Sequence, residues 1–197
     1  AAVVISGDST STVAANVIVV GAVTNDGTTG EGTLTFATTT ATTTLANSTI
    51  GATSAVLKAV NATSTAATAT FSGDVFATTV TATATDSTDS DTIAFGDKVT
   101  ATTLNLDGAG AFTFADTVTA AVVISGDSTS TVAADVIVVG AVSNDGTTGE
   151  GTLTFAASTG DFTLASTTIG ATGALLKEVN TVSTSGNTLE TATLGGN

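Results

Sequence analysis

Three groups of acidic and amide side chains have the type and spacing to bind a metal ion. They are Asp86, Asp89 and Asp91; Asn25, Asp26 and Glu31; and the equivalent Asn144, Asp145 and Glu150. Hard cations prefer oxygen ligands from carboxylates, amides, backbone carbonyls and water, so calcium is the ion that these groups would suit. Neither the EF-hand spacing nor a Gly-Gly-x-Gly-x-Asp repeat is present. The competing interpretation is that these are solvated turn residues and that the protein has no cofactor.

Several residue types that enzyme active sites commonly use are absent from the sequence. The sequence contains no His, Cys or Tyr, and its three cationic residues are Lys58, Lys98 and Lys177. Without imidazole or thiol groups it can form neither a Ser-His-Asp or Cys-His nucleophile nor a His/Cys zinc site. Paired carboxylates can hydrolyse glycosides, but no pair is distinguished here. The sequence therefore predicts a protein that is not an enzyme.

Charge and hydropathy exclude further classes of function. The net charge is -14, and this charge repels both the phosphates of nucleic acids and anionic membrane surfaces. The longest apolar run, Val17–Val23, is far too short to span a bilayer. We therefore expect no nucleic-acid partner and no membrane insertion.

The residues that surround the acidic groups are typical of β-strands. Thr, Ala and Val dominate the sequence, and branching at Cβ favours the extended backbone of a half-buried strand. Alanine alone favours helix. Here, however, Ala alternates with Thr and Val instead of recurring at helical spacing. The composition predicts an all-β protein.

A long internal repeat divides the chain. Ala1–Phe36 recurs as Ala120–Phe155 with two changes, Asn16 to Asp135 and Thr24 to Ser143. A looser match continues to Asn61 and Asn180. We therefore expect residues 1–119 to form one β repeat unit and residues 120–197 to form a partial second copy that is continuous with the first.

A shorter period lies inside the long one. Related segments begin at residues 71, 95, 114, 132 and 155, which are 18–24 residues apart. Within a segment the apolar residues alternate and then change phase, as Val99 and Ala101 do before Leu104 and Leu106. Because a one-residue slip would turn the core face outward, the phase change predicts a corner or bulge in the strand. About six short units would fill the long one.

These periods predict a parallel β-solenoid with coils of about 20 residues. The alternative is an antiparallel β-sandwich, which the uneven spacing of the units allows. We expect the recurring Phe residues to stack in the core, and Ser54–Asn61 and Gly173–Asn180 to form short helical turns.

The short units follow the pattern Phe-x-Gly/Asp-x-Val-x-Ala-Thr-Thr, best seen in Phe71–Ala82 and Phe95–Leu106. In this pattern and in composition the chain resembles the Ala/Thr/Val-rich β-strand-repeat proteins of bacterial surfaces, which include S-layer proteins and haemagglutinin-like adhesins. The resemblance covers most of the chain. It implies export, a location outside the cell or at the cell surface, and a structural or adhesive role, with a cell-surface glycan as one candidate partner.

The functional hypothesis is based on the terminal coils that a solenoid would have. An uncapped terminal coil leaves backbone N–H and C=O groups unpaired, and this sequence has no evident capping helix, no Pro and almost no Lys to protect such an edge. Either the chain is part of a longer polypeptide, or the end of each subunit pairs with the next. We expect an extracellular structural protein that self-assembles head-to-tail into a filament or surface layer, an open homo-oligomer. The alternative is a stalk segment of an adhesin or phage fibre whose binding tip lies elsewhere.

Overall fold

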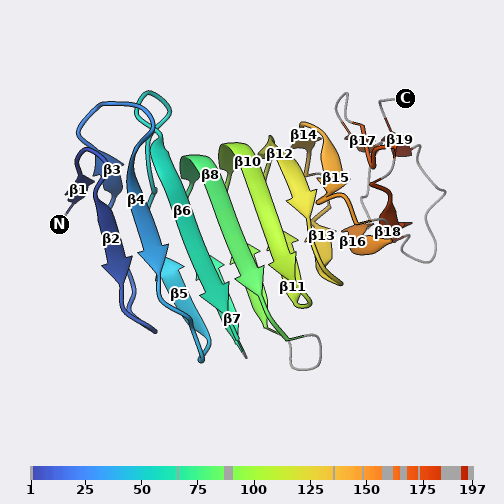
Figure 1. Ribbon diagram of the computed structural model, residues 1–197, viewed down its shortest axis with the longest axis horizontal. Coiled ribbons are helices and arrows are strands. Elements are labelled where there is room, and N and C mark those ends of the chain that lie inside the picture. Colours follow the sequence, from blue (N-terminus) through green and yellow to red (C-terminus); the bar gives the residue numbers. More distant parts are fainter. Residues whose placement is uncertain are drawn as a thin grey trace.

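The computed structural model describes residues 2–65, 67–86, 91–134, 136–147, 149–156, 162–164, 168–172, 174–182 and 192–194. In these residues the protein is all-β, and every named strand pairs in parallel with its neighbours. The strands stack into a β-solenoid of about 7 turns that are roughly 23 residues apart. β1 (Val3–Ile5) and β18 (Leu176–Thr181) lie at opposite ends of the stack (Figure 1).

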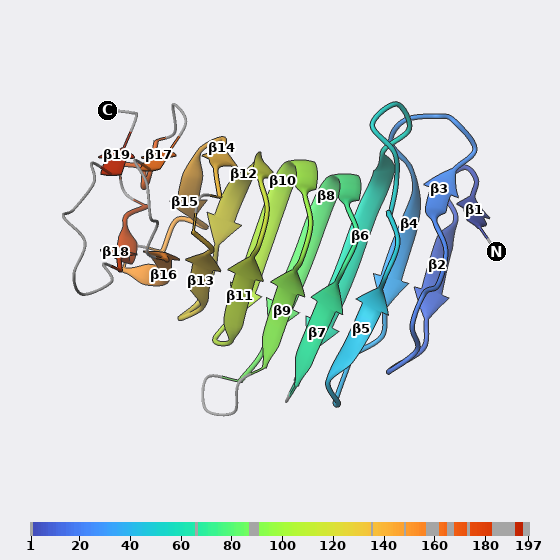
Figure 2. The ribbon, with the colours of Figure 1, turned by 180° about the vertical axis from the view of Figure 1, so that it is seen from behind.

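Two large parallel sheets face each other, and Figure 2 shows the second of them from its outer side. The first contains β2 (Thr10–Val13), β4 (Glu31–Phe36), β6 (Leu57–Ser64), β8 (Val75–Ala84), β10 (Val99–Gly108), β12 (Val118–Ile124), β14 (Val138–Val139) and β15 (Val142–Asn144). The second contains β5 (Thr43–Ala46), β7 (Thr68–Phe71), β9 (Thr92–Phe95), β11 (Ala111–Phe114), β13 (Thr129–Val132), β16 (Glu150–Phe155) and β18 (Leu176–Thr181). Two further pairs are β1 (Val3–Ile5) with β3 (Val23–Asn25), and β17 (Phe162–Leu164) with β19 (Ala192–Leu194).

The long strands are divided in two, as the phase change in the sequence predicts. The pairing of β10 with β12 shifts register between Thr100 and Thr103. Each central coil therefore has three paired segments, which we call walls 1, 2 and 3. In one coil they are 75–77, 79–84 and 92–95. The bend keeps Val75 and Val80 both buried although they are five positions apart, an odd interval that would put them on opposite faces of a straight strand.

The core consists of columns of like residues that repeat from coil to coil. Phe71, Phe95 and Phe114 are aligned in register on wall 3, and the centroids of successive rings are 5.2 Å apart in nearly parallel stacks. Phe36 contacts Phe71 edge to face at 5.5 Å. The predicted stack of Phe residues is thus confirmed over this part of the chain. Val132 takes the next position in the column, opposite Phe114.

The two copies of the repeat occupy different walls. Val3 begins a wall 1 column that takes five steps, through Val23, Ile50, Val75, Val99 and Val118. Val122 is the equivalent of Val3, yet it lies on wall 2, opposite Leu104. Likewise β2, β4 and β6 lie on wall 2, whereas their equivalents β13, β16 and β18 lie on wall 3. One repeat unit therefore makes five turns plus one wall, and the second copy is rotated by a third of a turn.

The fold confirms the solenoid, and the antiparallel sandwich was the wrong alternative. The coils are longer than the predicted 20 residues, so a unit holds five and a third of them instead of six. The predicted helical turns are wrong, because β6 and β18 occupy most of both segments. Leu57 and Val60 are fully buried in the stack, and this burial outweighs the local helical spacing. The residue 120 boundary lies inside β12, so the second copy continues the first without a break in the strand. Among the described residues, no helix is long and apolar enough to cross a membrane.

One buried hydroxyl gives a stability prediction. Ser130 is 1% exposed, and its Oγ has no hydrogen-bond partner. Its column neighbours are Phe112 and Leu153. Because an unsatisfied buried hydroxyl costs free energy, Ser130→Ala should raise the free energy of unfolding by about 1 kcal/mol. Urea denaturation measures this change.

The first copy provides the matched control. Ser11 is the equivalent of Ser130, but it lies in the first coil and is only half-buried. Ser11→Ala should change the free energy of unfolding by less than about 0.5 kcal/mol. Equal effects at the two positions would show that the Ser130 hydroxyl carries no penalty.

Candidate functional site

The two predicted calcium clusters in the repeated turns have structural contacts of their own. Asn25 is buried, and its Nδ2 donates to the carbonyl oxygens of Thr28 and Val56, while its Oδ1 accepts the N–H of Gly27 at 3.0 Å. Asn144 is bonded in the same way to Thr147, Leu175 and Gly146 in the second copy. Each asparagine thus closes its own turn and joins it to the next coil.

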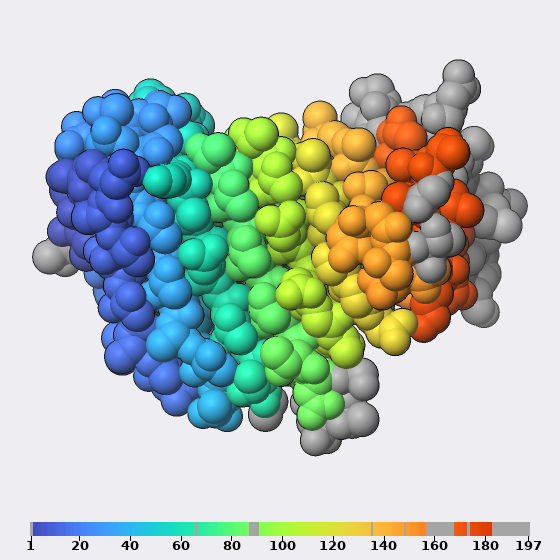
Figure 3. Space-filling view, viewed as in Figure 1, coloured from blue at the N-terminus to red at the C-terminus, as the bar shows by residue number. Residues whose placement is uncertain are grey.

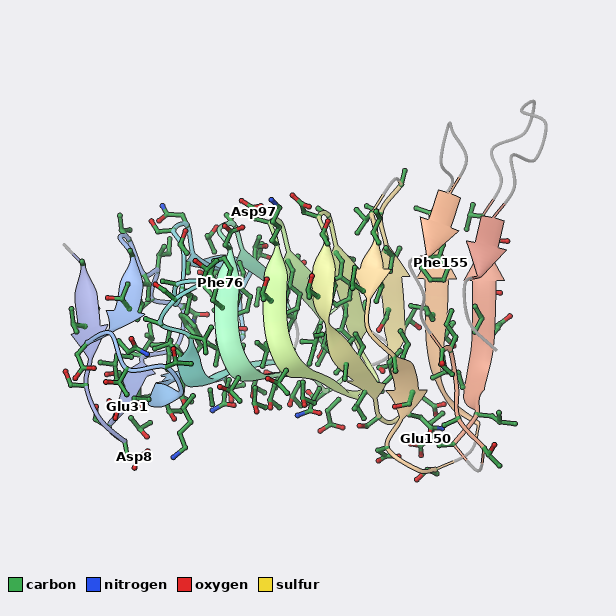
Figure 4. The ribbon with its side chains drawn as sticks, turned by 90° about the horizontal axis from the view of Figure 1, so that it is seen from above. Asp8, Glu31, Phe76, Asp97, Glu150 and Phe155 are labelled. Carbon is green, nitrogen blue, oxygen red and sulfur yellow. The ribbon has the colours of Figure 1, made fainter. Side chains whose placement is uncertain are left out.

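The acidic residues of these turns have other partners. The Oε2 atom of Glu31 accepts the N–H of Gly7 at 3.0 Å, and Glu150 accepts that of Gly126 at the same distance. Glu31 begins β4 on wall 2 and Glu150 begins β16 on wall 3, and Figure 4 shows the two residues in different coils. The exposed Asp26 and Asp145 accept N–H groups within their own turns, from Thr28 and Thr147.

The third cluster contains a buried acid. Asp91 is 0% exposed; its Oδ2 accepts the N–H of Asp86 at 2.8 Å, and its Oδ1 has no hydrogen-bond partner. Asp89 lies outside the described residues. A Cβ atom at Gly110 would lie 2.7 Å from Asp91 Oδ1, so only glycine fits beside this carboxylate. Within the described part of the chain no group of three or more acidic residues is arranged to hold a metal ion. Calcium binding at these clusters stays a prediction.

Sequence reasoning missed a pair of acids on adjacent coils. Asp74 and Asp97 both accept the N–H of Lys98, at 3.3 and 3.0 Å. Partial burial raises the pKa of Asp74 above its ordinary value, and the nearby Asp97 carboxyl raises it further. The signal was present in the aligned short units, because an Asp recurs between Phe and Val at Asp74, Asp97 and Asp116.

This pair predicts a pH effect on stability. Because the pKa of Asp74 is higher in the folded state, its contribution to stability is present below the ordinary aspartate pKa near 3.8 and is lost as the pH rises through the raised value. At neutral pH the two carboxylates repel each other. Asp74→Asn should therefore raise the melting temperature at pH 7 and change it little near pH 3.5.

Asp8 serves as the control, because its pKa is shifted in the opposite direction from that of Asp74. The hydrogen bond from Lys58 to Asp8, 2.8 Å long, lowers the pKa of Asp8, so its contribution is present above pH 3.8 and lost on acidification. Asp8→Asn should lower the melting temperature at pH 7, by a small amount because the pair is exposed. Thermal melts from pH 3 to 8 measure both variants. A lower melting temperature for Asp74→Asn at pH 7 would contradict the assignment.

The outermost coil at the N-terminal end is a candidate interaction surface. Figure 3 shows residues 2–20, which we call the N-terminal face, at the outer end of the stack. Val3 is 43% exposed and Val17 is 48% exposed, whereas their equivalents in the second copy, Val122 and Val136, are 5% and 6% exposed. The exposure of Ile18 (47%) hardly differs from that of Ile137 (40%), because both point outward. The largest excess exposure thus falls on Val3 and Val17, whose equivalents in the second copy are buried.

Unpaired backbone groups accompany these apolar side chains. In the second copy the N–H of Ser125 donates to Leu106 O and that of Ala133 donates to Phe114 O, both at 2.8 Å. The equivalent amides of Ser6 and Ala14 donate no hydrogen bond to any residue that the structure describes. The N-terminal face is therefore an open β edge with an apolar interior, the kind of surface that pairs with another strand.

Comparison with known proteins identified no relative of this chain. No family model matches the chain, and no curated protein or solved structure matches it.

Proposed function

We propose that this protein is a non-enzymatic structural protein of the cell surface or extracellular space, and that it assembles end to end into a filament or surface layer. The observation that carries the proposal is the N-terminal face, where Val3 and Val17 are exposed beside the open amides of Ser6 and Ala14. Pairing of this edge with another molecule would bury apolar surface and satisfy the amides. Such a contact is heterologous and does not close, so it produces an open polymer.

The rest of the molecule supports a structural role. The sequence supplies no His, Cys, Tyr or Arg for catalysis. Parallel coils continue the same columns of Val and Phe through the central stack, so further coils can be added without a new type of contact. The charge of -14 limits lateral association in the absence of cations. Divalent cations would bridge the acidic sides of neighbouring assemblies and favour a layer over single filaments.

A charge on the N-terminal face tests the proposal. Val3→Lys places an ammonium group where assembly would bury it, and inward-pointing charges block edge-to-edge pairing in natural sheets. We expect the concentration at which assembly begins to rise at least tenfold, which corresponds to about 1.4 kcal/mol for each contact. Sedimentation velocity and light scattering over a concentration series, with and without calcium, measure this onset.

The control has the same change of charge on the side of the stack. Thr119 is exposed on wall 1 and has a paired strand on each side, β10 and β14, so Thr119→Lys should assemble as the unmodified protein does. Circular dichroism checks that both variants keep their β structure. Equal assembly of the two variants would contradict an end-to-end contact through the N-terminal face.

A second candidate function is a stalk segment that joins other parts of a long polypeptide. Its supporting observation is that β12 (Val118–Ile124) runs across the boundary between the copies, so units are joined covalently as well as by stacking. A stalk segment would remain monomeric at every concentration and would bind no glycan by itself. The concentration series therefore distinguishes the two functions.

A further inference from the structure

The outer face of wall 3 carries a regular array of threonines, and Figure 2 shows this sheet from its outer side. Five successive strands, β7, β9, β11, β13 and β16, each contain two outward residues that flank a buried one. In β13, for example, Thr129 and Thr131 flank the buried Ser130. Eight of the ten outward residues are Thr and two are Ala. We call them the threonine face: Thr68, Thr70, Thr92, Ala94, Ala111, Thr113, Thr129, Thr131, Thr152 and Thr154.

Strand pairing holds the threonine face in a fixed grid. From β7 to β16 these strands pair in parallel with no shift of register, so each outward residue lies directly beside its equivalent in the next coil. Neighbouring strands of a sheet are about 4.8 Å apart, and the two outward residues of one strand are about 6.6 Å apart. The threonine face is therefore a two-dimensional array with two repeat distances.

Hydroxyl groups of this array are available to water. On wall 2, Asn61 Nδ2 donates to Thr35 Oγ1 at 3.3 Å, and Asn105 Nδ2 donates to Thr81 Oγ1 at 3.5 Å in the same column. Wall 3 has no such side-chain ladder among the described residues. A threonine hydroxyl can donate one hydrogen bond and accept two. Within the described part of the chain, no hydrogen bond is made by the hydroxyls of Thr70, Thr113, Thr131 and Thr154.

The threonine face is also uncharged, although the net charge of the protein is -14. No residue of β7, β9, β11 or β13 is ionisable. The one acid of β16, Glu150, begins that strand, and its Oε2 accepts the N–H of Gly126. The face therefore has no charge with which to attract an ionic ligand. Its methyl and hydroxyl groups suit a neutral surface that forms hydrogen bonds.

We propose that the threonine face binds ice. Water molecules bound to hydroxyl groups at fixed distances form an ordered layer, and the two repeat distances of the face are close to those of the hexagonal ice lattice. The stacked coils keep this layer aligned over five strands, so many weak contacts add up. This function goes beyond the proposed structural role and does not depend on end-to-end contact.

Threonine suits outward strand positions by propensity alone, so the test compares the same substitution on two walls. Thr131→Lys places a long charged side chain in the middle of the threonine face, between Thr113 and Thr154. Thr79→Lys is the matched control, because Thr79 is a half-buried outward residue of wall 2 with a paired strand on each side. Circular dichroism checks that both variants keep their β structure.

Slow growth of ice in a dilute solution of the full chain provides the measurement. Amino-acid analysis gives the protein content of the ice and of the remaining liquid. We expect the ice to take up the unmodified protein and the Thr79→Lys variant, and Thr131→Lys to lower the uptake at least tenfold. Exclusion of the unmodified protein from ice would overturn the inference, also if the protein binds an insoluble polysaccharide instead. Equal uptake of the two variants would overturn it as well.

A gain of activity tests the array itself. Ala94→Thr combined with Ala111→Thr fills the two gaps in the threonine face, and the control combines Ala59→Thr with Ala121→Thr, two outward positions of wall 2. Inhibition of ice recrystallisation over a concentration series measures the effect. The completed face should inhibit at a concentration at least twofold lower than the unmodified protein needs, and the wall 2 variant should not differ from it. The same result for both double variants would contradict binding through wall 3.

Discussion

Phe95→Ala should lower the free energy of unfolding by about 4 kcal/mol, because large-to-small changes of a buried Phe remove both its transfer energy and its packing. Phe95 is 1% exposed, and its ring stacks between those of Phe71 and Phe114 at centroid distances of 5.2 Å. Removing it breaks both ring contacts and leaves a cavity in the middle of the column. Neighbouring coils are held by backbone ladders and cannot close such a gap without losing hydrogen bonds. Urea denaturation, with the m-value checked for a change of mechanism, measures the loss.

Phe76 provides the matched control for this change. Phe76 is 9% exposed and lies on wall 1, opposite Thr100 and outside the ring column of wall 3; Figure 4 shows it away from Phe155. Phe76→Ala should therefore cost clearly less than Phe95→Ala. An equal loss in the two variants would mean that the stacked rings do not stabilise the solenoid beyond ordinary burial.

Gly108→Ala should destabilise the protein by more than about 3 kcal/mol, because it combines backbone strain with a steric clash. Gly108 ends β10 with φ +104, a conformation that residues with a Cβ atom rarely adopt. A Cβ atom there would lie 2.0 Å from the carbonyl oxygen of Ala84 in the preceding coil. That oxygen also accepts the N–H groups of Ala109 and Gly110 at 2.9 Å. Moving Ala84 away from a new Cβ atom at residue 108 would therefore break these hydrogen bonds between the two coils. Thermal and urea unfolding measure the effect.

Gly27 is the control position that distinguishes the cost of backbone strain from the cost of the steric clash. Its φ of +109 nearly equals that of Gly108, but no atom lies within 4 Å of where its Cβ would be. Gly27→Ala should cost only the conformational penalty, about 1 to 2 kcal/mol. If Gly108→Ala costs no more than Gly27→Ala, the coils are not held as closely at Gly108 as the structure requires.

The sequence predicts the features that depend on local patterns. The phase change between Ala101 and Leu104 predicts the bend in β10, because a strand must keep its apolar side inward. The recurrence of Phe at similar intervals predicts the stacked rings. Parallel stacking follows, since like residues meet only when successive coils run in the same direction.

Other features depend on the combined length of many turns, or on contacts between coils, and no local sequence pattern contains either. The rotation between Val3 and Val122 arises from the combined lengths of all the turns in a unit, so it cannot be predicted from any one of them. The short helix expected near Leu57 and Val60 is a strand, because neighbouring coils supply partners on both sides. The amide of Asn25 reaches Val56 in the next coil, a contact 31 residues away. The sequence cannot distinguish such a structural amide from a calcium ligand.

Cryo-electron microscopy of the concentrated protein, with and without calcium, tests end-to-end assembly most directly. We predict filaments or filament-built layers in which coils stack along the long axis with a spacing of about 4.8 Å, continuous across the boundaries between molecules. The Val3→Lys variant, prepared in parallel, should give far fewer and shorter assemblies. Dispersed single solenoids at every concentration, in both the presence and the absence of calcium, would contradict the proposal that the N-terminal face joins one molecule to the next.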